Sequence, residues 1–164
     1  MIEQEMAGII RFILTNTGDP APYYWDVPEH FCVPAVYFPV PEIETGGETF
    51  RAYYMDFEWY IKLFDRTEQG AYALGLAAVT AIRAARNRVP FIAEDGSVVK
   101  GAFVRLNDPR LKVLDDGAVQ LTLSFRSRRP YQDTEAVRTQ IFNMDLIAKA
   151  AGRKEEDHGE QAEE

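Results

Sequence analysis

The feature that most constrains this chain is a run of fifteen residues, Phe50–Phe64, which reads FRAYYMDFEWYIKLF and contains neither glycine nor proline. From residue 53 onward, large apolar side chains occupy every second position, and the positions between them are polar, charged or tyrosine. This two-residue period is typical of a β-strand with one buried face and one solvent-exposed face. Ordinary strands have about 5 or 6 residues, so the sequence predicts a strand of unusual length.

A strand of this length is longer than the domain that the chain can form. Fifteen extended residues span about 50 Å. A chain of 164 residues is expected to be only about 30 Å across, from a radius of gyration of about 15 Å. We therefore expect part of the strand to overhang the core or to bend around it. Its predicted partner is the short strand AVYFPV, residues 35–40, which Pro39 marks as an edge or bulged strand.

The remaining patterns predict one α+β domain over residues 1–151 and a disordered acidic tail at 152–164. The sheet of the domain is expected to be mixed or mostly antiparallel, with about four to six strands. A central helix at 67–88, rich in alanine and glycine, packs on this sheet. Further helices are expected at 2–14 and after Asp133, because apolar residues recur there at helical spacing.

The sequence also predicts the local structure of three shorter segments. Residues 20–34, rich in proline and aromatic residues, are predicted to be an ordered loop that packs its rings onto the core. Residues 41–49, PEIETGGET, are predicted to be a loop with a mobile centre. Residues 89–101 predict a short hairpin that turns at EDGS.

The register of the last hairpin follows from its apolar pattern. A two-residue turn at Asp116-Gly117 would place apolar residues opposite polar ones, which a sheet with one buried face resists. A three-residue loop, 115–117, pairs Val113 with Val119 and Leu111 with Leu121. We therefore predict the longer loop, with Gly117 in the left-handed region.

The charge distribution bears on possible partners. The net charge of −8 argues against a general nucleic-acid binder. Residues 1–50 hold one basic residue against eight acids, whereas residues 83–130 hold ten basic residues against five acids. These charges are either scattered and solvated or form complementary faces that meet between copies.

Localisation is read from the ends and the cysteine content. No apolar run is long enough to predict a membrane span, and the N-terminus carries acids where a signal peptide has basic residues. A single cysteine, Cys32, excludes an internal disulfide and fits a reducing compartment. We therefore expect synthesis in the cytoplasm.

Candidates for chemistry are few. His30 and Cys32 could share a strand face, but nothing nearby completes a zinc site or a catalytic triad, and Cys32 is expected to be a small buried hydrophobe. Asp56 and Glu58 share one face and could in principle act as a carboxylate pair, although an ordinary solvated strand surface is the favoured interpretation. The aromatic residues 23–25 favour core or interface packing over ligand stacking. No cofactor or metal is expected.

Three stretches of the chain together carry a resemblance to a known family. The first is YYWDVPEHFCVPAVYFPV, in which a VP-x-x-F-x-x-P element leads into a strand. The second is FRAYYMDFEWYIKLFD, followed directly by a helix. The third is GAFVRLNDPRLKVLDDGAVQLTLSFRSR, with a DG turn, a strand and a basic end. Together they extend over about residues 2–131, and they resemble the tail terminator family (tail completion or head–tail joining proteins) of long-tailed phages and prophages of Gram-positive bacteria.

The resemblance implies a small structural protein that forms a ring, commonly a hexamer. Such a ring caps the phage tail tube and joins it to the head connector, so its implied partners are other copies, the tail tube protein and the head–tail connector protein. It implies no catalytic residues, no cofactor, no membrane and no sequence-specific nucleic acid. The implied location is the bacterial cytoplasm during assembly and the head–tail junction of the virion afterwards.

The candidate subunit interface combines the long strand, residues 42–48 and the basic end of the last strand. We expect the acidic groups to meet the arginines of a neighbouring copy. The candidate residues are Glu42, Glu44, Glu48, Tyr54, Asp56, Glu58, Tyr60, Arg126, Arg128 and Arg129.

Two other classes of function stay open at this point. One is a small-molecule-binding domain or small hydrolase with a pocket between the helix at 67–88 and the sheet. The other is a host protein that uses this fold as an interaction module. A pocket would require polar groups among the inward-facing positions of the sheet, and those positions are almost wholly apolar.

Overall fold

The computed structural model of the chain describes residues 2–114 and 117–132. The chain divides after Arg129 into two units. The elements below belong to the first unit, Met1–Arg129, except for Pro130, the last residue of β8. In chain order the elements are α1 (Ile2–Asn16), β1 (Ala21–Tyr24), β2 (Ala35–Phe38), β3 (Glu42–Thr49), β4 (Ala52–Phe64), α2 (Glu68–Ala84), β5 (Arg88–Ile92), β6 (Val98–Arg105), β7 (Arg110–Val113) and β8 (Val119–Pro130). The predicted α+β class is confirmed, with a mixed sheet of six strands and a separate pair, β5–β6.

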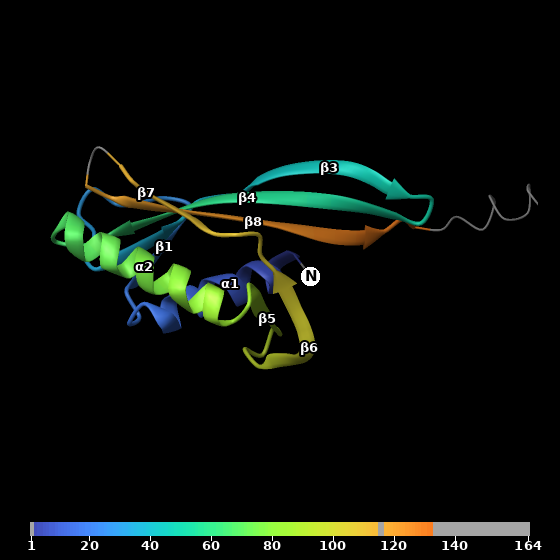
Figure 1. Cartoon of the computed structure of the whole chain (residues 1–164), viewed down its shortest axis with the longest axis horizontal. Helices are drawn as coiled ribbons and strands as arrows, with labels where there is room; N and C mark the ends of the chain where they lie inside the picture. The colour runs from blue at the N-terminus through green and yellow to red at the C-terminus, as the bar shows by residue number, and fades with distance from the viewer. Residues whose placement is uncertain (1, 115–116, 133–164) are drawn as a thin grey trace, which may run out of the picture. The chain divides into compact units, whose positions relative to one another are not determined.

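The long strand β4 lies at the centre of the main sheet. The strand order is β1-β2-β4-β8-β7, and β3 also pairs with β4. Both β2 and β3 run antiparallel to β4, with Ala35 opposite Phe64 and Glu42 opposite Glu58. They therefore share one edge of β4, with a break at residues 39–41. Along the other edge lies β8, which points in the opposite direction to β4 (Figure 1).

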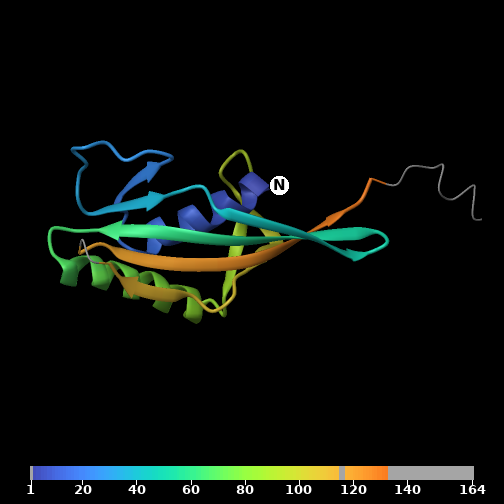
Figure 2. The ribbon, with the colours of Figure 1, turned by 90° about the horizontal axis from the view of Figure 1, so that it is seen from above.

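One face of this sheet forms the core. Helices α1 and α2 lie on the same side of it, and in the view from above no described helix covers the opposite face (Figures 1 and 2). The buried apolar side chains of β4 and β8 are Phe57, Trp59, Ile61, Leu63, Val119, Leu121, Leu123 and Phe125. Ile9 and Ile13 of α1 and Ile82 of α2 pack against them. The alternation in the sequence therefore assigned the inner face correctly.

Helix α2 approaches the sheet closely because its inward residues are small. Its buried residues are Ala71, Gly75, Ala78 and Ile82. A Cβ added at Gly75 would lie 2.6 Å from a methyl carbon of Leu111 and 3.2 Å from one of Val119, so only glycine fits there without displacing a neighbour. Apolar side chains fill the contact between α2 and the sheet. The structure therefore does not support the ligand pocket that the sequence left open at this place.

Two local features are defined at atomic detail, and the second was predicted. Thr67 is the N-cap of α2, and its hydroxyl accepts a hydrogen bond of 3.0 Å from the Gly70 N–H. In the β7–β8 hairpin, Val113 lies opposite Val119 and Leu111 opposite Leu121. Gly117 has φ of 78°, in the left-handed region. The apolar pattern was therefore sufficient to fix this register.

Three segments differ from the sequence prediction. Residues 42–49, predicted as a loop, form β3, because pairing along β4 outweighs the weak strand preference of glutamate and glycine. Residues 20–34 contain the short strand β1, which pairs in parallel with β2. Helix α2 ends at Ala84 rather than at residue 88, since the backbone turns left-handed at Arg86 and Asn87.

The expectation that Cys32 is buried is also wrong. Its thiol is free and exposed, in the loop before β2. The neighbouring Phe31 packs on the sheet instead of Cys32, with its ring centroid 5.0 Å from that of Phe64. The helix predicted after Asp133 and the tail at 152–164 lie outside the described residues.

Candidate functional site

The candidate site is a ribbon of three strands that extends beyond the helices. It comprises β3, Ala52–Asp56 of β4 and Arg126–Arg129 of β8, and we call it the arm. In Figure 1 it runs past the ends of α1 and α2. All of β3 except Gly46 is exposed, and Ala52–Asp56 are half-buried on both faces. Strict burial of alternate residues begins only at Phe57. The predicted overhang of the long strand is therefore present.

A tight turn closes the arm between β3 and β4. The Thr49 hydroxyl accepts hydrogen bonds from the backbone N–H groups of Arg51, at 3.2 Å, and Ala52, at 3.1 Å. Phe50, which follows Thr49 in the turn, is fully exposed, with a relative accessibility of 104%. The turn thus holds an aromatic side chain in water at the tip of the arm.

The middle of the arm is held by a cross-strand stack. The ring of Tyr54 lies over Gly46, where an added Cβ would meet the Tyr54 hydroxyl at 2.4 Å. The Arg126 guanidinium lies 4.0 Å from the centroid of this ring, a favourable distance for a cation–π contact. One residue from each of the three strands therefore contributes to the stack.

Charge pairs link the strands on the outer face. Arg126 donates two hydrogen bonds of 2.7 Å to both oxygens of Asp56. Arg128 binds both oxygens of Glu48 in the same way. Arg110 of β7 donates a bond of 2.8 Å to Glu58. Such bidentate arginine–carboxylate pairs fix geometry more than they add stability when they are exposed.

These pairs change the interpretation of the predicted interface residues. We expected Glu48, Asp56 and the arginines to meet across two copies, but the structure pairs them within one chain. Glu42 and Glu44 project from the same face, and no ion pair joins either to another described residue. The assignment of this surface to a subunit interface stays a prediction.

The pairing is reflected in the ionisation of the outer face. A hydrogen bond from Arg128 lowers the pKa of Glu48, and one from Arg126 lowers the pKa of Asp56. A hydrogen bond to Glu58 raises the pKa of the Tyr60 hydroxyl. Asp56 is therefore held as a carboxylate, which suits a structural partner of arginine and not a general acid.

On the inner face, a buried polar cluster joins the base of the arm to α1. Glu5 accepts hydrogen bonds from the Ser127 hydroxyl, at 2.7 Å, and from Arg129, at 3.1 Å. The side chains of Glu5 and Arg129 are only 7% and 12% exposed. Glu5 was missed in the sequence. The available signal was that Ser127 and Arg129 continue the inward positions of β8, while Glu5 lies one turn before Ile9.

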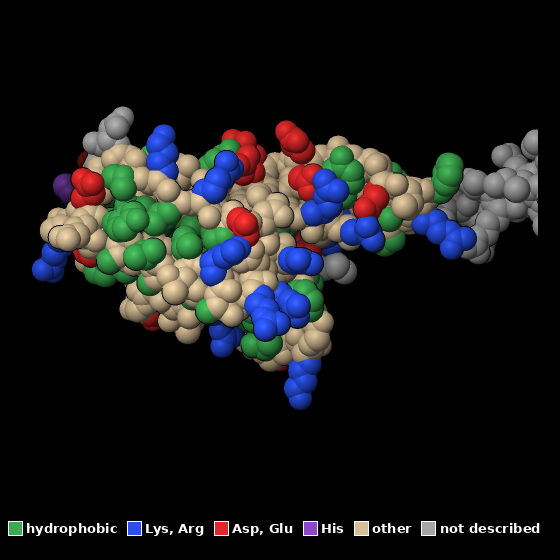
Figure 3. All heavy atoms as spheres, viewed as in Figure 1, with side chains coloured by type: hydrophobic (Ala, Val, Ile, Leu, Met, Phe, Trp, Pro, Cys, Tyr) green, Lys and Arg blue, Asp and Glu red, His purple; other side chains and the backbone are tan. Residues whose placement is uncertain are grey.

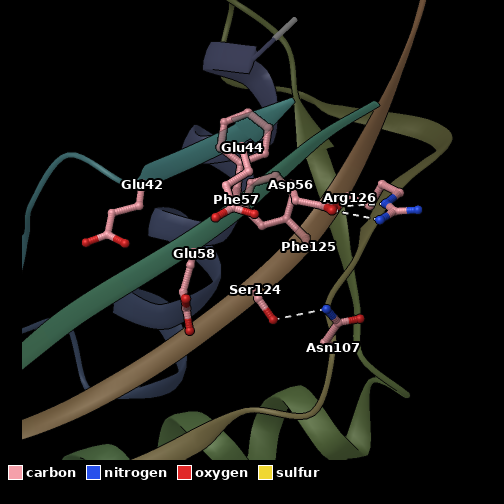
Figure 4. Close-up of a pocket in the computed structure, with 9 residues that line it drawn as sticks. All are labelled: Glu42, Glu44, Asp56, Phe57, Glu58, Asn107, Ser124, Phe125 and Arg126. Atoms are coloured by element: carbon pink, nitrogen blue, oxygen red, sulfur yellow. Dashed lines mark hydrogen bonds and ion pairs between the residues drawn. The ribbon is translucent and has the colours of Figure 1, made fainter. Parts of the chain in front are cut away.

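Two hollows flank the arm. The first, about 510 Å³, lies on the outer face and is lined by the acids Glu42, Glu44, Asp56 and Glu58 together with Arg126 (Figure 4). Ser124 and Asn107, which join through a hydrogen bond of 3.0 Å, form its other side. Among the described residues, no group of three or more histidines, cysteines or acids could hold a metal ion.

The second hollow, which we call the apolar groove, lies between α1 and the β2–β3 connection. Its volume is about 410 Å³. Residues that line it include Met6, Ile10, Trp25, Val40, Ile43 and Phe57. Trp25 is 76% and Val40 57% exposed. Of the two alternatives expected for the aromatic residues 23–25, packing on the core fails for Trp25, whose ring borders an open groove, and interface packing stays a prediction.

Charge is segregated on the visible surface. Figure 3 shows acidic and basic side chains interleaved along the arm, whereas lysine and arginine gather over the β5–β6 hairpin. Exposed basic residues there are Arg88, Lys100 and Arg105. No helix within residues 2–114 and 117–132 is long and apolar enough to cross a membrane.

Comparisons with known proteins place this arrangement in a family. No protein-family model matches the chain. The phage-like element PBSX protein XkdJ of Bacillus subtilis (strain 168) is 28% identical over 148 residues, which is 90% of this chain and 100% of that protein. The uncharacterized protein YqbJ of the same strain is 30% identical over 110 residues, 67% of this chain and 74% of that protein.

A solved structure is also similar in part. A chain from the virion of a native gene transfer agent particle aligns with 79% of this chain and 97% of its own length, with a TM-score of 0.48 and 12% identity.

The chain therefore belongs to the family that contains XkdJ and YqbJ. The phage-related family that the sequence indicated is confirmed, because XkdJ is a protein of a phage-like element.

Proposed function

We propose that the chain is a structural protein of a phage-like particle and acts as a tail terminator. In this role copies assemble into a ring, of the hexameric kind that the sequence resemblance implies. The ring caps the tail tube and offers a surface to the head–tail connector. Assembly takes place in the bacterial cytoplasm, and the protein ends in the virion.

The relationship to XkdJ carries the proposal. It extends over the whole of that protein and nearly the whole of this chain, so the two share a domain and not merely a motif. Membership in a phage-like element makes a particle component the simplest common role. The sequence resemblance to tail terminators then narrows the place in the particle to the head end of the tail.

The architecture supports self-assembly. An arm that extends beyond its own helices exposes two faces of a sheet, and a sheet edge in β3, to neighbouring molecules. If the arm meets a different surface on the next copy, the contact is heterologous, and heterologous contacts close into rings when the rotation permits. The outer-face acids Glu42 and Glu44, together with Tyr54 and Tyr60, stay candidates for such a surface.

We also propose that the protein is not an enzyme. The carboxylate pair Asp56 and Glu58 is bound by Arg126 and Arg110, as expected of a structural surface. His30 and Cys32 lie in an exposed loop, and neither contacts a second catalytic group among the described residues. A small-molecule binder with a pocket beneath α2 is disfavoured by the close contact of Gly75 with Leu111.

The test is deletion of the gene from the phage or phage-like element that carries it, followed by electron microscopy of induced lysates. A tail terminator predicts headless tails of uncontrolled length together with filled, tailless heads. Restoration by the wild-type gene in trans serves as the control. Normal tails joined to heads would overturn the proposal, and tails of normal length without heads would favour a head–tail joining protein instead.

A further inference from the structure

We propose that the tip of the arm, Phe50, inserts into the apolar groove of a neighbouring copy of the chain. The inference rests on the proposed function, because it names the contact through which copies in a ring hold one another. It follows from two features of one molecule that are complementary in chemistry and unable to meet within that molecule.

The tip has the form of an insert. Phe50 is the most exposed of the large apolar side chains among the described residues, at 104%. Its backbone is held by the Thr49 hydroxyl, which binds the two following N–H groups. The strands behind it are tied by the Tyr54 stack and by the pair of Arg128 with Glu48. Because the backbone of the turn is already fixed, little backbone entropy is lost when the tip binds.

The groove has the form of a receptor. It is an open hollow of about 410 Å³ whose walls are apolar side chains of α1, the end of β1 and the β2–β3 connection. Trp25 and Val40 form exposed edges, and Phe57 and Trp59 lie at its base. Aromatic anchors in apolar pockets are the usual centres of binding energy at protein interfaces.

The two features cannot join in one chain. Ile43 and Phe57, which face each other across β3 and β4, line the groove. Phe50 lies seven residues further along the same ribbon, so about 20 Å separates it from the groove. Folding the tip back would break the β3–β4 pairing from Thr45 to Gly47. The occupant of the groove is therefore the arm of another copy.

Charge supports the same orientation. Arg51, beside the tip, is exposed and forms no ion pair with the residues that the structure describes. Asp26, next to the groove residue Trp25, is likewise exposed and without an arginine or lysine partner in the described part of the chain. Insertion of Phe50 brings Arg51 of one copy near Asp26 of the next, and these opposite charges favour this arrangement of the two copies.

The first test compares the mass of variants by light scattering across a concentration series. Phe50→Ser removes the insert at a fully exposed turn, and Val40→Asp places a charge in the groove. Each should weaken self-association at least tenfold, as expected from losing a buried phenyl group. Val98→Ser, at a 53% exposed site on β6 away from tip and groove, is the matched control and should leave the mass unchanged.

The outcomes separate this contact from the proposed function. Rings of normal mass in both the Phe50 and the Val40 variants would overturn the inference and leave ring formation intact. A wild-type protein that stays monomeric at all concentrations would overturn both. Circular dichroism and thermal melting of Phe50→Ser should match wild type, so that a loss of mass reports association and not folding.

The second test locates the contact by crosslinking. In a Cys32→Ser background, Phe50→Cys protein is mixed with Val40→Cys protein carrying a tag of different mass, and a short bismaleimide is added. A crosslinked pair that contains one chain of each kind supports the inference. The matched control is Phe50→Cys mixed with Leu76→Cys, on the exposed face of α2. Crosslinking to residue 76 in preference to residue 40 would overturn the proposed groove.

Discussion

The two halves of β4 share one sequence pattern and differ in their surroundings. From Phe57 to Leu63, every second residue is buried beneath the helices. From Ala52 to Asp56 the alternation of side chains continues, but every residue is only half-buried, and Met55 reaches the edge of the core. The period of a strand therefore determines which side chains share a face, whereas burial depends on what covers that face.

The two halves are also held by different interactions. The covered half relies on apolar packing, such as the parallel stack of Phe57 on Phe125 with centroids 4.7 Å apart. The arm relies on the Tyr54–Arg126 contact and on bidentate charge pairs. Apolar burial supplies most of the stability of a domain, so the covered half should determine whether the chain folds, and the arm should determine what the folded chain contacts.

The largest effect is expected at Trp59 in the covered half. Its side chain is fully buried, and its indole N–H donates a hydrogen bond to the Pro39 carbonyl. Trp59→Ala should lower the free energy of unfolding by about 3–5 kcal/mol, as measured by chemical denaturation of dilute protein. Phe50→Ala at the exposed tip is the counterpart and should stay within about 0.5 kcal/mol of wild type. Similar losses in the two variants would contradict the division between the halves.

The second effect concerns the boundary between the halves, where Glu5 meets Arg129. Glu5→Ala leaves the guanidinium buried without its counter-charge and should cost about 3 kcal/mol, again by chemical denaturation. The double variant Glu5→Leu/Arg129→Met removes both charges and should recover a large part of that loss. A double variant as unstable as Glu5→Ala would show that the ion pair is not the source of the effect.

The fold was largely predictable because apolar alternation is a strong signal wherever a face is covered. The long strand, the inward positions of β8 and the register of Val113 with Val119 all followed from it. The strand β3 could not be found in this way. Its sequence EIETGGET carries no apolar face, and its structure depends on pairing with β4 rather than on its own residues.

The pairings within the candidate site could not be predicted from the sequence. Alternation put Asp56 and Glu58 on one strand face and Arg126 and Arg128 on the outward face of β8, whereas Arg129, predicted for the same surface, lies on the inner face beside Glu5. The sequence could not decide whether Arg126 meets Asp56 of the same chain or of another, because both arrangements satisfy the same charges. Glu5 was missed since a buried acid is recognisable only once its partners Ser127 and Arg129 lie beside it.

A smaller effect is expected in the arm at Gly46. A side chain there would overlap the Tyr54 ring, which can rotate away and so lose its contact with Arg126. Gly46→Val should therefore cost only about 1 kcal/mol in global unfolding. Hydrogen exchange at β3 amides should accelerate, while the amides of β4 from Phe57 onward keep their protection. Gly47→Val, next along β3 but opposite Tyr53, is the control, and an equal response of both variants would contradict the role of the stack.

The smallest effect is a pH dependence confined to the arm. Arg126 and Arg128 lower the pKa of Asp56 and of Glu48. A carboxyl group whose pKa is lower in the folded state contributes stability above its unfolded pKa, about 4, and that contribution is lost as the pH falls through the folded pKa. Wild type should therefore be more stable at pH 7 than Arg126→Gln/Arg128→Gln, and the difference in urea denaturation should shrink toward pH 3. Because both pairs are largely exposed, 0.5 M salt at pH 7 should reduce the same difference. A stability difference that stays constant with both pH and salt would mean that the charge pairs contribute nothing and that the effect comes from the packing of Arg126 on Tyr54.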